Sequence, residues 1–246
     1  MKKYVILSVF SVLFFSGCAE HRQRETEQMS FPAKYYKNIK IETSNGEILS
    51  QALTDADVIT VKLTKWATGY TVQDAKLNLG KIDVRVREDT SDSMLRIYVD
   101  APTRTILCGC EVELQLPESI YANLITSNGN VSAQGHKEGL RLRSKNGEIY
   151  VNGTAGKLNV VTSNGKLRLV NHLGDIYAKT SNGGLELSRT VGEADIETSN
   201  GTISVQGHTG NIEGNTSNGK VEASVVIDKE EGKCRFFSSN GSVSVA

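Results

Sequence analysis

The stretch Thr162-Ser163-Asn164-Gly165 lies near the middle of a chain of 246 residues and contains only small residues. Its Asn-Gly pair recurs at a fixed spacing over five successive steps, and a last, longer step leads to one more pair. The Asn residues of these pairs are Asn128, Asn146, Asn164, Asn182, Asn200, Asn218 and Asn240. A constant repeat of this length is typical of a solenoid, in which each repeat forms one coil.

The residues between two Asn-Gly pairs show how one coil is built. Leu167 and Leu169 follow the pair, and Ile176 and Ala178 follow a later glycine. Apolar residues two positions apart are typical of strands with one buried face. Corresponding strands of successive coils run in the same direction, so they pair in parallel, and such connections are right-handed in nearly all cases. For residues 121–246 the sequence therefore predicts an all-β fold, a right-handed parallel β-helix with 18-residue coils.

The Asn-Gly pairs are predicted to be structural turns. Asn and Gly adopt positive φ at low cost, so each pair is expected to reverse the chain with its Asn in that conformation. Asn side chains stacked from coil to coil are also expected to bond amide to amide along the solenoid axis. The motif is therefore interpreted as architecture and not as a catalytic element.

Residues 31–120 fit the repeat only at their beginning, where Ile39 and Ile41 precede an Asn-Gly pair at Asn45. Alternating or β-branched residues predict further strands at 58–63, 76–86, 95–99 and 111–116. We interpret this part as longer, irregular coils at one end of the same solenoid. A separate small β-sandwich is the alternative.

The N-terminal segment has the layout of a secretory signal peptide, which we place at residues 1–17. Lys2 and Lys3 precede a largely apolar run over residues 4–15, and small residues follow it. The run is shorter than a membrane-spanning helix needs. The protein is therefore expected to be exported.

This segment leads into Cys18 through two small residues, an arrangement that resembles a bacterial lipobox. In a lipobox, a diacylglycerol is attached to the Cys thiol and cleavage makes that Cys the new N-terminus. Phe15 stands where Leu is usual, and Ala19 after the Cys resembles sorting to the outer membrane. Lipidation is therefore predicted at Cys18, with residues 18–30 forming the lipidated Cys and a polar tether.

Charge excludes one class of partner. The chain has 28 Lys and Arg residues against 28 Asp and Glu residues, without a basic block, so nucleic acid is not expected as a partner. The best acidic cluster consists of the outward residues Asp195, Glu197 and Glu213, which could hold Ca²⁺ or act as an acid–base pair. We interpret these carboxylates as solvated surface charge, so no catalytic residue, metal or cofactor is predicted.

The histidines and cysteines are given structural interpretations. Three histidines spaced two repeats apart, too far from one another to share a metal, are interpreted as exposed turn residues. They are His136, His172 and His208. Cys108 and Cys110 are interpreted as buried free thiols, and Cys234 as a small core residue in an inward slot. The charged segment 228–231 is expected to bulge from the last complete coil.

The lipobox, the strand at residues 112–117 and the repeated Thr-Ser-Asn-Gly coils resemble the bacterial "putative adhesin" family of β-helix domains of unknown function. The resemblance covers about residues 35–246. It implies a non-enzymatic lipoprotein of the cell envelope, at the outer membrane, with an adhesin-like surface for an unknown protein or glycan. The family has no agreed catalytic residues to assign. A β-helix polysaccharide lyase or hydrolase is the alternative.

Overall fold

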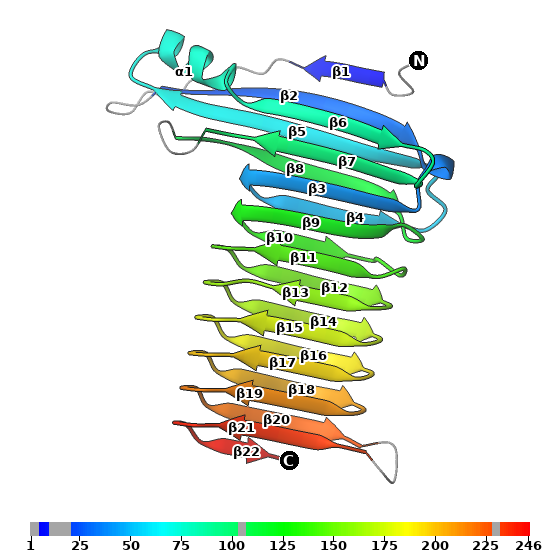
Figure 1. Ribbon diagram of the computed structural model, residues 1–246, viewed down its shortest axis with the longest axis vertical. Coiled ribbons are helices and arrows are strands. Elements are labelled where there is room, and N and C mark those ends of the chain that lie inside the picture. Colours follow the sequence, from blue (N-terminus) through cyan, green and yellow to red (C-terminus); the bar gives the residue numbers. More distant parts are fainter. Residues whose placement is uncertain (1–4, 10–20, 103–106, 228–231) are drawn as a thin grey trace.

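The computed structural model describes residues 5–9, 21–102, 107–227 and 232–246, so Cys18 and the charged segment 228–231 lie outside the described residues. The chain forms an elongated stack of two sheets that share one core (Figure 1). One sheet has 12 strands and the other has 10.

The regular coils each contribute one strand to each sheet in turn. Their strands are β9 (Tyr121–Asn128), β10 (Val131–Gln134), β11 (Leu140–Ser144), β12 (Ile149–Ala155), β13 (Leu158–Val161), β14 (Leu167–Leu173), β15 (Ile176–Thr180), β16 (Leu185–Val191), β17 (Ala194–Thr198), β18 (Ile203–Thr209), β19 (Ile212–Thr216), β20 (Val221–Val226), β21 (Cys234–Ser238) and β22 (Val243–Val245). Neighbouring strands pair in parallel, and Cα partners such as Leu167 and Leu185 occupy the same position of successive coils. The predicted parallel β-helix with 18-residue coils is confirmed.

The core is built from the inward residues of every coil. In β14, Leu167 and Leu169 are completely buried and Arg168 between them is exposed. Ile176 and Ala178 of β15 are buried in the same way. Each coil repeats these slots, so the apolar side chains form one continuous column along the solenoid.

Each residue type of the repeated motif has its own role. The Thr162 hydroxyl, buried inside the coil, donates to the Gly147 carbonyl of the preceding coil at 3.0 Å. The Asn164 amide donates to Asn146 Oδ1 at 2.7 Å, and the same bond links each repeat Asn to the next from Asn128 to Asn240. The predicted amide ladder is confirmed. A Cβ at Gly165 would overlap the Gly147 carbonyl oxygen, so glycine lets the coils stack closely.

The positive φ predicted for the repeat Asn residues is wrong. Among the described residues, the non-glycine residues with positive φ are Asp55, Ser93, Asn171 and Arg189, and none of these belongs to an Asn-Gly pair. Left-handed backbone occurs instead at the second corner of the coil, as at Gly174 with φ 133°. In the regular coils the Asn-Gly corner therefore needs its Asn for the ladder and its Gly for close stacking, not for positive φ.

One coil of the N-terminal half lies directly on the regular coils. Its strands β3 (Asn38–Asn45) and β4 (Ile48–Leu53) pair in parallel with β9 and β10. On the other side, β3 pairs in parallel with β7 (Met94–Asp100) and β4 with β8 (Cys108–Pro117). Strands far apart in the sequence therefore extend both sheets of the solenoid (Figure 1).

At the N-terminal end of the stack the outermost strands are antiparallel, where the sequence predicted irregular coils of the solenoid. β5 (Val58–Gly69) pairs antiparallel with β8 and with β2 (His21–Pro32), and β6 (Asp83–Asp89) pairs antiparallel with β7. A short 3-10 helix, η1 (Ala33–Tyr35), follows β2. The tether predicted for residues 18–30 is wrong from His21 onward, because β2 pairs with β5 along its whole length.

The strand predicted over residues 76–86 begins instead as a helix, α1 (Val72–Leu79), so this prediction is wrong in its first part. Thr71 and Asp74 form a capping box, and Ala75 and Leu79, four residues apart, are buried. These local signals favour a helix over a strand. In the part of the chain that the structure describes, no helix is long and apolar enough to cross a membrane.

The three histidines interpreted as exposed turn residues are buried, so this prediction is wrong. Together with Thr154 and Thr190 they occupy one inward slot of successive coils, and a residue with positive φ precedes each slot. That residue bends the corner and carries the next side chain inside. The resulting histidine column consists of His136, Thr154, His172, Thr190 and His208.

The cysteine predictions have mixed outcomes. Cys108 and Cys110 are buried free thiols, as predicted, and burial raises their pKa values. Cys234 has the inward register, as the Cα partner of Ile212, but is exposed, so its assignment to the core is wrong. It lies in the last coil, and no further coil of the described residues covers it.

Candidate functional site

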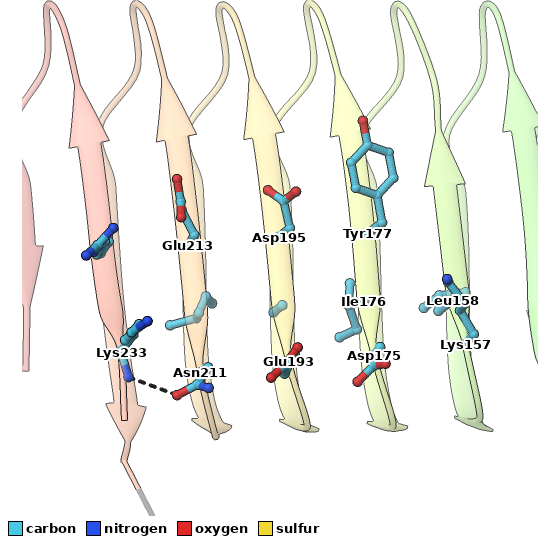
Figure 2. Close-up of a pocket in the computed structure, with 13 residues that line it drawn as sticks. Lys157, Leu158, Asp175, Ile176, Tyr177, Glu193, Asp195, Asn211, Glu213 and Lys233 are labelled. Atoms are coloured by element: carbon cyan, nitrogen blue, oxygen red, sulfur yellow. Dashed lines mark hydrogen bonds between the residues drawn. The ribbon is translucent and has the colours of Figure 1, made fainter. Parts of the chain in front are cut away.

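The acidic residues singled out in the sequence lie on the outer face of the 10-stranded sheet. Asp195 in β17 and Glu213 in β19 are Cα partners, so their side chains project side by side (Figure 2). Glu197 lies two residues further along β17, where its carboxylate accepts a 2.7 Å hydrogen bond from Lys179. The structure therefore brings Asp195 and Glu213 together and leaves Glu197 in a separate ion pair.

Asp195 and Glu213 line a shallow groove of about 420 Å³ across five strands, β13, β15, β17, β19 and β21, which we call the charged groove. Its polar side chains form two rows. The turn row contains Lys157, Asp175, Glu193, Asn211 and Lys233, and the strand row contains Tyr177, Asp195, Glu213 and Arg235. Carboxylates dominate the centre, and basic residues stand at both ends.

The local sequence of each coil builds these rows. Gly174 makes the second corner, Asp175 follows it, Ile176 points into the core and Tyr177 points outward again. Because side chains alternate along a strand, positions 175 and 177 share the outer face. The backbone bond from the Ile176 amide to the Glu193 carbonyl, at 2.8 Å, aligns the next coil, so each row repeats about every 4.8 Å.

The last coil supplies the basic end of the charged groove. The Lys233 amide nitrogen donates to Asn211 Oδ1 at 2.8 Å, as the dashed line in Figure 2 marks. Arg235 is the Cα partner of Glu213, so a guanidinium group lies on the strand next to that carboxylate.

The centre of the groove concentrates negative charge. Partial desolvation, followed by the nearby carboxylates of Glu213 and Glu197, raises the pKa of Asp195 above its usual range, and Lys179 acts in the opposite direction. The hydrogen bond to Glu197 is the main reason that the pKa of Lys179 is raised. A ligand that brings hydrogen-bond donors to Asp195 and Glu213 would relieve this repulsion.

The arrangement is suited to binding. The groove is open, and Tyr177 is 36% exposed beside the carboxylates. The lining residues include no Ser, Thr or Cys. Among the described residues, no group of three or more His, Cys, Asp and Glu side chains could hold a metal ion.

The sequence prediction included the acids but missed Tyr177, Lys157, Lys233 and Arg235. Alignment of the coils by their repeat places Tyr177 in the column of Asp195, so the aromatic residue could have been found. Lys233 and Arg235 of the last coil come after a step of 22 residues instead of 18, so the repeat does not align them with the acidic residues. Of the other predicted sites, the repeat Asn residues form the ladder described above, and Cys18 lies outside the described residues.

Comparison with solved structures finds weak likeness over the whole length. A putative adhesin from Bacteroides fragilis NCTC 9343 is 10% identical, with a TM-score of 0.44, and the match covers 90% of this chain and 97% of that one. A putative adhesin from Parabacteroides distasonis ATCC 8503 is 12% identical, with a TM-score of 0.41, and the match covers 91% of this chain and 97% of that one. A putative lipid binding protein from the same strain is 13% identical, with a TM-score of 0.35, and the match covers 89% of this chain and 96% of that one. No curated protein matches the chain.

A match to a known domain family covers most of the chain. The family described as Toastrack DUF4097 matches residues 36–246. This range extends from β3 to β22. It includes the regular coils, the antiparallel pairs β5–β8 and β6–β7, and the whole charged groove. The chain therefore belongs to the Toastrack DUF4097 family.

Proposed function

We propose that this protein is a non-enzymatic, lipid-anchored scaffold of the bacterial cell envelope, at the outer membrane, and that it binds a glycan in the charged groove. The observation that carries the proposal is the groove itself. It places an exposed aromatic ring, Tyr177, in line with the paired carboxylates of Asp195 and Glu213 and the guanidinium of Arg235.

A glycan matches this chemistry better than a flat protein surface does. Sugar hydroxyl groups donate hydrogen bonds to carboxylates and accept them from Lys and Arg side chains. The apolar face of a sugar ring can pack against the Tyr177 ring, whose hydroxyl remains in water. Because successive coils are evenly spaced, the groove offers polar side chains at regular intervals along a polymer.

The main argument for an enzyme is the raised pKa of Asp195 beside Glu213. In glycoside hydrolases, however, the two carboxyl groups flank the scissile bond, so that the substrate lies between them. Asp195 and Glu213 project from adjacent strands in the same direction, and the groove leaves them open to water. This geometry supports binding over hydrolysis.

The anchoring part of the proposal rests on Cys18 and on the strand that follows it. Cleavage before Cys18 would remove β1 (Val5–Val9), which pairs with β2, and would leave β2 at the edge of its sheet. The first half of β2 contains Arg22, Arg24 and Glu25, and such charges protect an edge strand from pairing with other chains. The sequence of β2 is thus compatible with a free edge.

Glycan binding can be tested with the full chain carrying Cys18→Ser, on an array of bacterial polysaccharides followed by calorimetry. Tyr177→Ala is expected to weaken binding about tenfold, since it removes the buried contact of one aromatic ring. Tyr150→Ala is the matched control, because Tyr150 lies on the outer face of the other sheet. Absence of any glycan ligand, or equal binding by both variants, would contradict the proposal.

The enzyme alternative has its own experiment. Wild-type protein and the triple variant Asp195→Asn, Glu197→Gln and Glu213→Gln are incubated with acidic and neutral polysaccharides, with and without Ca²⁺. We expect no change in chain length with either protein. Cleavage by the wild type that is lost in the triple variant would replace the scaffold proposal by a lyase or hydrolase.

A further inference from the structure

Three large apolar side chains are exposed on neighbouring segments at the end of the molecule opposite the last coil. Tyr70 is 88% exposed, Leu77 is 62% exposed and Leu107 is 56% exposed. They lie just after β5, on α1 and just before β8, at the upper left of Figure 1. We call these three residues the apolar tip.

Hydrogen bonds around Thr68 connect the segments that carry the apolar tip. The Thr68 amide and hydroxyl donate to the Leu107 carbonyl at 3.0 and 3.2 Å, and the Thr68 carbonyl accepts from Asn78 Nδ2 at 2.8 Å. Tyr70 is two residues from Thr68, and Leu77 precedes Asn78. The tip is therefore a built part of the fold, fixed at the end of β5.

The expected lipid anchor comes close to this tip. His21, the first residue of β2, is the Cα partner of Gly69, which immediately precedes Tyr70. Cys18 is three residues before His21. Three residues of extended chain span at most about 10 Å, so acyl chains on Cys18 would begin within that distance of the start of β2.

The charges beside the tip suit an anionic surface. Lys76 and Lys81 are exposed next to Leu77, and the Lys81 ammonium group donates to Asn78 Oδ1 at 2.9 Å. Asp74, the acidic residue of α1, is engaged in the capping box with Thr71. Exposed aromatic and Leu side chains beside Lys side chains are typical of helices and loops that lie in a membrane interface.

We propose that the apolar tip inserts into the membrane interface beside the lipid anchor, so that the molecule stands on the membrane by this end. This inference rests on the lipid anchoring proposed above. The anchor alone would leave the solenoid free to turn about the segment before β2. Insertion of Tyr70, Leu77 and Leu107 would fix its orientation and direct the regular coils away from the bilayer (Figure 1).

The first test removes the anchor and measures the tip alone. Mature protein that begins at residue 18 and carries Cys18→Ser, and so lacks the apolar run over residues 4–15, is floated with vesicles of phosphatidylethanolamine and phosphatidylglycerol. Addition of Tyr70→Ser, Leu77→Ser and Leu107→Ser is expected to lower the partition coefficient at least tenfold. Phe237→Ser is the matched control, because Phe237 is 72% exposed in the last coil and should not affect binding. Equal partitioning with and without the tip substitutions would overturn the proposal.

The second test uses the lipidated protein, so that a failure of the anchor and a failure of the tip can be distinguished. Deuterium exchange of the α1 backbone amides is compared between the lipidated protein on vesicles and the Cys18→Ser protein in solution without detergent. We expect slower exchange on the vesicles. The tip substitutions should abolish this protection while flotation of the lipidated protein persists. Exchange of the α1 amides that is unchanged by vesicles would overturn the tip proposal and leave the anchor intact. Loss of flotation through Cys18→Ser tests the anchor itself.

Discussion

Acidification is expected to destabilise the fold through the buried histidine column. His136, His172 and His208 each have one ring nitrogen within 2.8 to 2.9 Å of a Ser or Thr hydroxyl. Burial lowers the pKa values of all three, to about 4 for His136. The imidazoles are therefore neutral in the folded protein at pH 7, and protonation of any of them would bury a charge.

The sign of the effect follows from proton binding by the two states. Between pH 6.5 and about 4 the unfolded chain binds more protons at His136 than the folded protein does, so stability falls as the pH falls. Each pH unit in this range lowers the free energy of unfolding by about 1.4 kcal/mol, which is about 2 kcal/mol at pH 5 for His136 alone. His172 and His208 act in the same direction.

The assay is urea unfolding followed by circular dichroism at pH 7, 6 and 5, with a second probe to check that the transition is two-state. The informative variant is His136→Thr, because the column itself holds Thr at 154 and 190. Between pH 7 and 5, the fall in its free energy of unfolding should be about 2 kcal/mol smaller than the fall in the wild type. His21→Thr is the control, because His21 is exposed in β2.

Two outcomes, one for the wild type and one for His136→Thr, would refute this reasoning. One is a wild-type free energy of unfolding that is the same at pH 7 and pH 5. The other is a pH dependence in His136→Thr that equals that of the wild type, because His136 would then titrate alike in the folded and unfolded states. A pH dependence that changes equally in His21→Thr would show that burial is not the cause.

Gly165→Ala should lower the free energy of unfolding by about 3 kcal/mol because its Cβ would overlap the Gly147 carbonyl, whereas Gly184→Ala, with space for a Cβ, should change it little in the same thermal melt. Thr162→Val leaves the Gly147 carbonyl without its hydroxyl donor and should cost about 1–3 kcal/mol, and an unchanged melting temperature would argue against that role. Cys18→Ser should move the protein from the detergent phase to the soluble fraction of fractionated cells, and unchanged membrane association would contradict lipidation.

The regular coils could be predicted because their contacts recur at one sequence separation. The alternation of Leu167, Arg168 and Leu169 predicts which side chains enter the core, and the spacing of the Asn residues predicts which strands pair. The candidate site could be predicted only in part. Asp195 and Glu213 are one repeat apart, but Arg235 joins them across the longer last step.

The sequence by itself determined the solenoid, because a strand pattern that repeats with a constant period encodes both the strands and their partners. Only the tertiary structure decided the N-terminal half, where β4 is paired with β8 although a long segment of chain separates them and no period records the pairing. The tertiary structure also decided which side chains are buried at the corners of the coils and in the last coil. A residue with positive φ turns His172 inward, and Cys234 stays exposed because burial depends on whether another coil covers the slot.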